Sequence, residues 1–364
     1  MSSPSRRFDK KFRAGVLGAT GMVGQRFVNM LANHPWFELA DLAASERSSG
    51  RKYADVVKWH LDTPIPEAAR NMVVKDLAPN LECDFVFSAL DSSVAGTAEE
   101  EFARAGYPVL SNSKNHRMDP DVPLLIPEVN ASHLDSIPVQ QRNRGYESGF
   151  IVTNPNCSTA GLVLVLKPLA DAFGLEKIFV VTMQAVSGAG YPGVASLDIL
   201  GNVVPFISGE EEKMEAEPQK LLGRWDGSRF IDAGLGISAH CNRVPVRDGH
   251  LECVSLGLKK IASIREVAEV LRDFAVDDEL ASLPTAVRNP IVSWTRKIAR
   301  SLVTTPAPVT VWLPSSAASA NVRSSTSSSR SSRTISSAEP PVPPSSMPNS
   351  SPSVASSITA TPPN

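Results

Sequence analysis

Gly18-Ala19-Thr20-Gly21-Met22-Val23-Gly24 is the stretch of sequence that decides the fold. It follows an apolar strand predicted at 13–17 and opens a helix predicted from about 23 to 32. A second strand at 37–43 completes a strand–helix–strand unit. Glycines at this spacing allow a tight turn and a close backbone approach, and the amino end of the helix faces a pyrophosphate. A structural turn is the alternative, but the position between strand and helix favours a dinucleotide-binding loop.

Strands and helices continue to alternate after this unit. The apolar run at 83–90 suits a strand buried on both faces, and it is followed by a helix at 94–105 and a strand at 107–111. The alternation predicts an α/β fold with a doubly wound, Rossmann-type parallel sheet over residues 1–155.

Residues 156–292 have a different pattern, which predicts a mixed α+β catalytic domain. A helix is expected to start at Cys157 and another to span 264–274. Strands are predicted at 178–185, 236–246 and 251–258. Asp248-Gly249 separates the last two strands, which predicts that they form a hairpin.

The last part of the chain, residues 293–364, is rich in serine and proline and has no hydrophobic periodicity. Such a segment buries too little apolar surface to offset the entropy lost on ordering. We therefore expect a disordered tail.

The bulk composition excludes several classes of protein. A net charge of -2 gives no general attraction to nucleic acid or to a membrane surface. The chain has no apolar run near the ~20 residues of a membrane-spanning helix, and the polar, basic start lacks a secretory signal. The four cysteines show no disulfide or metal-ligand spacing, so we predict a cytoplasmic protein, no metal site, and a cysteine free for catalysis.

The end of the second predicted strand reads Ala44-Ser45-Glu46-Arg47-Ser48. NAD enzymes usually place an acidic residue here to hold the ribose hydroxyls, which Glu46 could do. Ser45, Arg47 and Ser48 instead suit a 2′-phosphate, because hydroxyl and guanidinium groups donate hydrogen bonds to it. The predicted cofactor is NADP.

Asn154-Pro155-Asn156-Cys157-Ser158-Thr159 places a cysteine at the first turn of a helix. The helix dipole and unpaired N–H groups stabilise a thiolate there, so we expect a lowered thiol pKa. Thiolate attack on a carbonyl gives a thioester or hemithioacetal, which can exchange hydride with nicotinamide. A small buried side chain is the alternative for any cysteine; it fits Cys83 and Cys253, and Cys241 stays open.

These motifs resemble the aspartate-semialdehyde dehydrogenase family, particularly its fungal and archaeal branch, over residues 12–292. The resemblance implies NADPH-dependent reductive dephosphorylation of L-aspartyl 4-phosphate to L-aspartate 4-semialdehyde, in lysine, threonine and methionine biosynthesis. It also implies a homodimer or homotetramer, with residues 156–292 serving dimerisation too. Further motifs that carry the resemblance are Ser111-Asn112-Ser113-Lys114-Asn115-His116-Arg117, Ile126-Pro127-Glu128-Val129-Asn130, Gln184-Ala185-Val186-Ser187-Gly188-Ala189-Gly190, Glu215-Ala216-Glu217-Pro218-Gln219-Lys220, Asn242-Arg243-Val244-Pro245-Val246 and Gly249-His250.

The resemblance implies a set of site residues. Cys157 would be the nucleophile, His250 the general acid/base, and Gln184 the residue that orients the acyl group. The predicted substrate contacts are Arg243 for the carboxylate, Arg117 and Lys220 for the phosphate, Glu217 for the amine, and Asn156 in the same pocket. The predicted cofactor contacts are Gly18, Thr20, Gly21, Met22, Val23, Gly24, Ser45, Arg47, Ser48, Ser88, Ser187 and Gly188.

Simpler interpretations exist for several of these residues. Histidines beside a turn are usually exposed, and His240 competes with His250. Glu217 and Lys220 belong to a charged stretch, 210–220, of the kind that usually forms a solvated helix face. Rival functions are N-acetyl-glutamyl-phosphate or malonyl-CoA reduction on the same scaffold, or an inactive NADP-binding protein.

The tail lacks a segment that the family carries after its catalytic domain, with a pattern like His-Asn-x-x-Arg-Gly-Ala-Ala-Gly. A shifted reading frame joins the third base of each codon to the first two bases of the next codon. In this frame, codons that encode residues 295–302 can also encode Glu-Glu-Asp-Arg-Pro-Gln-Pro, and codons for residues 333–349 can encode the missing pattern. This predicts a frameshift near residues 291–293, with a genuine Ser/Pro-rich extension as the alternative.

Overall fold

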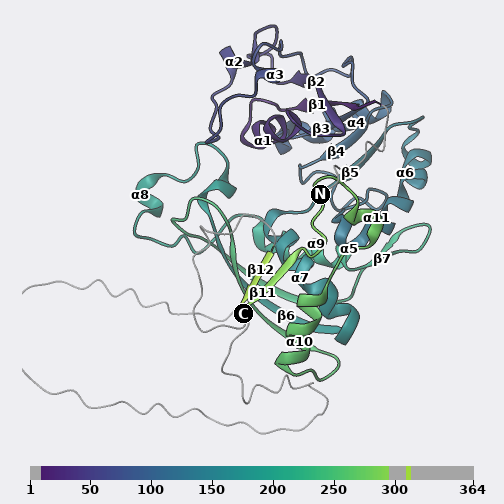
Figure 1. Ribbon diagram of the computed structural model, residues 1–364, viewed down its shortest axis with the longest axis vertical. Helices are drawn as coiled ribbons and strands as arrows, with labels where there is room; N and C mark the ends of the chain where they lie inside the picture. The colour runs from purple at the N-terminus through teal and green to yellow at the C-terminus, as the bar shows by residue number, and fades with distance from the viewer. Residues whose placement is uncertain (1–9, 295–308, 313–364) are drawn as a thin grey trace, which may run out of the picture. The chain divides into compact units, whose positions relative to one another are not determined.

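The computed structural model describes residues 10–294 and 309–312 (Figure 1). The amino-terminal part contains a five-stranded sheet in the order β2-β1-β3-β4-β5, in which every neighbouring pair is parallel. Its strands are β1 (Phe12–Leu17), β2 (Phe37–Ala43), β3 (Phe85–Ser88), β4 (Pro108–Ser111) and β5 (Phe150–Thr153). Its helices are α1 (Met22–Leu31), α2 (Tyr53–Val56), α3 (Glu67–Arg70), α4 (Ser92–Arg104), α5 (Pro127–Asn130), η1 (Ala131–Ser136) and α6 (Ile137–Arg144).

The predicted doubly wound sheet is confirmed. Both faces of β1 are buried, because Val16 packs in one apolar cluster with Val28 while Leu17 packs in another with Phe102. The strand order changes direction between β1 and β3, so a crevice is expected at their carboxyl ends. Gly18 follows β1 at this edge.

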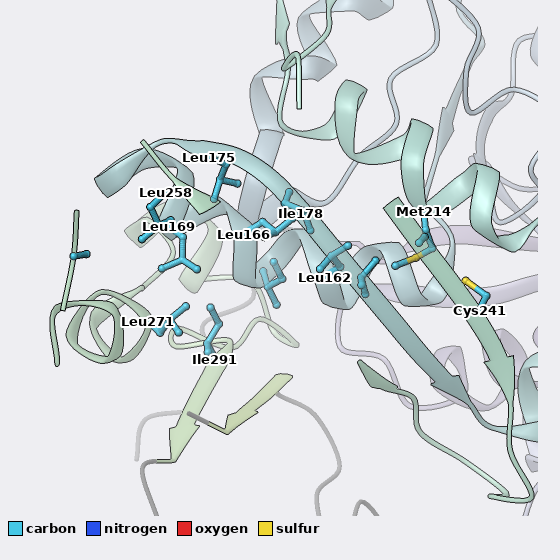
Figure 2. Packing of buried hydrophobic residues seen from close by; sticks show 14 residues of the cluster. Leu162, Leu166, Leu169, Leu175, Ile178, Met214, Cys241, Leu258, Leu271 and Ile291 are labelled. Atoms are coloured by element: carbon cyan, nitrogen blue, oxygen red, sulfur yellow. The ribbon is translucent and has the colours of Figure 1, made fainter. Parts of the chain in front are cut away.

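The following part is built on a three-stranded sheet in the order β10-β6-β9. The strands are β6 (Leu175–Gln184), β9 (Gly236–Arg243) and β10 (Leu251–Leu258), and the long helices are α7 (Cys157–Phe173), α9 (Glu210–Leu221) and α10 (Ile264–Asp273). Shorter elements are η2 (Val186–Ala189), α8 (Ser196–Ile199), β7 (Arg224–Trp225), β8 (Phe230–Ile231), α11 (Asp278–Ala281), β11 (Ile291–Trp294) and β12 (Val309–Trp312). Figure 2 shows the core between helices and sheet, where leucines of α7 meet Ile178, Met214 and Leu271.

The predicted hairpin between β9 and β10 is wrong. The two strands lie on opposite sides of β6, with β9 parallel and β10 antiparallel to it. The chain does bend at Asp248, and Gly249 has φ +87°, but turn residues do not determine which strands pair. The central place belongs to β6 because its run Ile178-Phe179-Val180-Val181 has apolar side chains on both faces.

Part of the predicted tail is a strand. Val309-Thr310-Val311-Trp312 forms β12, which pairs in parallel with β11, so the structure differs there from the predicted disorder. Its β-branched and aromatic residues favour strand pairing. Residues 295–308 and 313–364 lie outside the described residues, as do residues 1–9. In the described part of the chain, no helix is long and apolar enough to cross a membrane.

Candidate active site

The glycine loop packs closely at the carboxyl end of β1. Gly18 has φ +74°, and a Cβ there would lie 2.6 Å from the Ala89 carbonyl oxygen, across the crevice on the β3 side. A Cβ at Gly24 would lie 2.2 Å from the Gly18 carbonyl oxygen. Gly21 is the N-cap of α1 and provides no side chain to bind the first N–H groups of the helix. These groups can therefore bind an anion at the amino end of the helix.

The other predicted cofactor contacts differ in exposure. Ser45 and Arg47 are exposed after β2, whereas Ser48 is buried in a turn in which its N–H donates to the Ser45 carbonyl (2.8 Å). Glu46 is also exposed. The carboxylate that could bind the ribose of NAD and the Arg47 side chain that could bind the 2′-phosphate of NADP are therefore both accessible here. Ser88 is fully buried, and its hydroxyl donates to Glu99 Oε1 (2.6 Å); its side chain is therefore turned inward. In the glycine loop, Thr20 and Met22 are half-buried and Val23 is exposed.

Cys157 is the first residue of α7, and Asn156 caps this helix. The Asn156 Oδ1 accepts hydrogen bonds from the N–H groups of Ser158 (3.0 Å) and Thr159 (3.3 Å). Cys157 itself is exposed, and its Sγ lies 3.2 Å from His250 Nε2. The structure thus joins the predicted nucleophile to the predicted acid/base.

His250 is held by the backbone at the end of β6. The Ala185 N–H donates to His250 Nδ1 (3.1 Å), so the hydrogen of the neutral ring lies on Nε2 and faces the sulfur. Burial and the Arg243 charge lower the pKa of His250, which favours this neutral ring. His240, the competing histidine, is exposed and lies beside Phe179 with ring centroids 5.7 Å apart.

The thiol pKa differs from the expectation. Desolvation by the surrounding protein atoms and then the charge of Glu210 raise the pKa of Cys157, and hydrogen bonding from the Ser158 backbone opposes them. The expectation considered only the helix end and omitted the desolvation, which is the larger cause, and the carboxylate. The free site therefore favours the thiol.

Arg243 and Gly188 form one wall of this site. Arg243 is 6% exposed, and its Nη1 donates to the Ala185 carbonyl (2.8 Å). A Cβ at Gly188 would lie 2.8 Å from Arg243 Nη1 and 3.3 Å from His250 Cε1, so the absence of a side chain allows both groups to lie here. Ser187 is half-buried, and its N–H donates to the Arg247 carbonyl (3.1 Å).

Glu210 is a site residue that the sequence reasoning missed. Its Oε2 accepts from Asn156 Nδ2 (2.8 Å) and Gln184 Nε2 (3.3 Å), and Lys213 Nζ binds its Oε1 (2.5 Å). Burial opposes ionisation, but the hydrogen bond and charge of Lys213 outweigh it and lower the pKa of Glu210. The signal was present: Met214 and Leu221 lie four and eleven residues on, which predicts a buried face for Glu210.

Glu217 and Lys220 are buried, so the interpretation as a solvated face is wrong. Glu217 Oε1 accepts from Arg117 Nη1 (2.8 Å), and its Oε2 accepts from the Asn156 N–H (2.7 Å). Lys220 Nζ donates to three backbone carbonyls at 2.7–2.8 Å. Both side chains therefore use their polar atoms within the protein. Arg117 is 7% exposed beside them.

Comparisons with known proteins agree on one family. Residues 13–137 match the model "Semialdehyde dehydrogenase, NAD binding domain", and residues 166–297 match "Semialdehyde dehydrogenase, dimerisation domain". The aspartate-semialdehyde dehydrogenase of Archaeoglobus fulgidus is 50% identical over 283 residues, 78% of this chain and 81% of the relative. That of Cryptococcus neoformans is 49% identical over 294 residues, 78% and 80% of the two chains. The crystal structure of the Candida albicans enzyme with NADP superposes with a TM-score of 0.74 at 41% identity, covering 80% of this chain and 84% of that one.

Proposed function

The chain belongs to the aspartate-semialdehyde dehydrogenase family, and on this premise we propose that it reduces L-aspartyl 4-phosphate to L-aspartate 4-semialdehyde with NADPH, releasing phosphate. The observation that carries the proposal is the Cys157 thiol 3.2 Å from His250 Nε2, with Arg243 and Glu210 beside them. The test is phosphate-dependent reduction of NADP with aspartate semialdehyde, by wild type and by Cys157→Ala. Wild-type turnover that Cys157→Ala abolishes supports the proposal, and equal rates contradict it.

Cys157 is the nucleophile of this proposal. The exposed thiol first loses its proton to water. The thiolate then attacks the acyl carbon, the S–C bond forms, the C–O bond to the phosphate breaks, and phosphate leaves to give a thioester. His250 holds a hydrogen at Nε2 and donates it in a hydrogen bond, first to the sulfur and then to the carbonyl oxygen as negative charge develops there. Gln184, adjacent to Ala185 at the end of β6, orients the acyl group.

The polar groups of the site fit an amino acid that carries a phosphate. Arg243 binds the α-carboxylate. We assign the α-ammonium to Glu210 in place of Glu217, because the charge of Glu210 acts on the Cys157 thiol and Glu210 is the more exposed of the two carboxylates, at 8% against 2%. Arg117 binds the phosphate. Lys213 replaces Lys220 as the second phosphate cation, since all three Nζ hydrogens of Lys220 are directed at carbonyls.

This charge pattern favours a free amino acid head group over the substrates of related reductases. An N-acetyl group removes the ammonium that Glu210 would bind, and malonyl-CoA carries none. A comparison of phosphate-dependent NADP reduction with the corresponding aldehydes tests this choice. We expect turnover with aspartate semialdehyde and none with the N-acetylated aldehyde.

NADP fits the glycine loop, because a side chain at Gly18 or Gly24 would fill it and the amino end of α1 has no capping side chain. Gly18, Gly21 and Gly24 would hold the pyrophosphate, and Ser45, Arg47 and Ser48 the 2′-phosphate. When bound, NADP would supply hydride chemistry at the carbon attached to Cys157.

We further propose a cytoplasmic homodimer with an NADP-binding domain over 1–155 and a catalytic and dimerisation domain over 156–292. The match to a dimerisation domain supports this. Phe179, on the central strand of the three-stranded sheet, is 45% exposed and suits such an interface.

We also retain the proposal that the tail after about residue 293 results from a frameshift. Sequencing the transcript across residues 285–300 tests it. An uninterrupted frame that encodes the chain as written contradicts it.

A further inference from the structure

Glu217 and Lys220, two buried charged side chains of α9, connect Arg117 to the nucleophile. Arg117 is the residue predicted to bind the phosphate. Glu217 is 2% exposed, and each of its carboxylate oxygens binds a different part of the site. Oε1 accepts from Arg117 Nη1 at 2.8 Å, and Oε2 accepts from the Asn156 backbone N–H at 2.7 Å. One carboxylate therefore fixes the distance between the guanidinium and the residue that precedes Cys157.

Lys220, one turn further along α9, holds the loop that carries Arg117. Its Nζ donates to the carbonyl oxygens of Arg117 (2.8 Å), Asp119 (2.7 Å) and Val122 (2.7 Å). The Phe230 ring covers the ammonium, with Nζ 4.5 Å from the ring centroid. Burial lowers the pKa of Lys220 to about 8, so the ammonium stays charged at neutral pH. Lys220 has no hydrogen left for a phosphate.

The guanidinium of Arg117 is fixed on two sides and unpartnered on the third. Its Nη1 binds Glu217, and its Nη2 donates to the Asn112 carbonyl at 3.0 Å. Arg117 Nε is buried and has no hydrogen-bond partner among the described residues. Nη1 and Nη2 each carry two hydrogens and each donates one of them in these two hydrogen bonds, so a ligand oxygen can bind the remaining hydrogens of the fixed guanidinium.

We propose that Glu217 and Lys220 are positioning residues: they fix Arg117 relative to Cys157 and do not themselves bind substrate. This inference rests on the proposed function, in which Arg117 binds the phosphate. It replaces the direct contacts to amine and phosphate that the family resemblance implied for these two residues.

The two roles differ in which substrate they affect. If Glu217 bound the ammonium, Glu217→Gln would raise the KM for aspartate semialdehyde. If it positions Arg117, the same change leaves a donor facing Arg117 or Asn156 and raises the KM for phosphate by about tenfold, since hydrogen bonds to charged groups are strong. The semialdehyde KM then changes by less than about twofold. Glu212→Gln is the matched control, because Glu212 lies on the same helix and is exposed.

A double-mutant cycle with Arg117→Ala gives the decisive result. If Glu217 acts through Arg117, Glu217→Gln has no further effect on the phosphate KM in the Arg117→Ala background. An undiminished effect there overturns the inference. So does an unchanged phosphate KM in Glu217→Gln when the wild type is active, whereas an inactive wild type contradicts the proposed function instead.

Lys220→Met provides a second variant, which removes the ammonium and keeps a long apolar side chain beside Phe230. Phosphate affinity is measured without turnover, as protection of Cys157 from iodoacetamide by inorganic phosphate. We expect folded Lys220→Met to need about tenfold more phosphate for half protection. Lys220→Arg, which keeps the charge, should show the same loss of phosphate affinity as Lys220→Met, because a planar guanidinium does not match three converging carbonyls. A wild-type phosphate affinity in Lys220→Arg would favour direct phosphate binding and overturn the inference.

Discussion

Cys157 Sγ and His250 Nε2 lie 3.2 Å apart, although 93 residues separate them in the chain. The contact exists because β6 lies between β9 and β10, so the connection from β9 to β10 has to cross the end of β6. At that crossing the Ala185 N–H orients the imidazole. The topology of the sheet therefore produces the catalytic pair.

His250→Ala removes the Nε2 hydrogen that faces the sulfur and the developing oxyanion. We expect kcat to fall by about 100- to 10,000-fold while the KM for phosphate changes little, because the loss concerns the chemical step. Steady-state kinetics of NADP reduction measure both constants. His240→Ala is the control, since His240 is exposed on the same sheet; equal losses in the two variants would contradict the assignment.

The loop and the nucleophile could be predicted from local sequence, because each depends on residues adjacent in the chain. Gly18 and Gly24 are needed for a turn between consecutive elements, and Cys157 follows a strand directly. The choice of His250 over His240 required the family resemblance, since it depends on which strands pair. The hairpin prediction failed for the same reason: Asp248-Gly249 encodes a turn and not a strand order.

The interpretation of α9 as a solvated helix face failed for a different reason. In a stretch with so many charged residues, composition predicts exposure, and only the helical period shows that Glu210, Glu217 and Lys220 face inward with Met214. Which buried carboxylate meets substrate depends on what else binds it. Sequence cannot show that Arg117 and Asn156 occupy Glu217.

Glu210→Gln is expected to make Cys157 more acidic. The Glu210 carboxylate raises the pKa of the thiol, so its neutralisation lowers that pKa and increases the thiolate fraction at neutral pH. The pH dependence of iodoacetamide alkylation measures this, and its midpoint should move to lower pH. The KM for aspartate semialdehyde should rise by about tenfold in the same variant, since the ammonium loses its partner. A midpoint that stays in place would contradict the influence of Glu210 on the thiol.

Gly188→Ala should damage catalysis without unfolding the protein. The added methyl group would lie 2.8 Å from Arg243 Nη1 and 3.3 Å from the His250 ring, so both groups must move. A displacement of this kind lowers kcat/KM by about 100-fold. Gly188 is exposed, so the melting temperature should change little. Gly161→Ala, inside α7, is the control: its Cβ meets only Glu252 Oε1 at 3.9 Å, and activity should persist.

Glu252 should make the protein less stable as the pH rises. Burial raises the pKa of this carboxyl to about 8, whereas an unfolded chain has the ordinary value of about 4.3. The folded state therefore binds more protons between these two values, and stability falls with increasing pH across that range. The contribution of the neutral acid is complete below about pH 4 and is lost as the pH passes through about 8.

Glu252→Gln keeps the side chain neutral at every pH, so the variant should match the wild type near pH 5 and exceed its melting temperature at pH 9. Thermal unfolding of both proteins at pH 5, 7 and 9 gives the difference between their melting temperatures at each pH. The titration of every group that the two proteins share cancels in this difference. Glu212→Gln, at an exposed position, should show no such trend. A gain for Glu252→Gln that is as large at pH 5 as at pH 9 would mean that the carboxyl is ionised throughout, and that a partner offsets its burial.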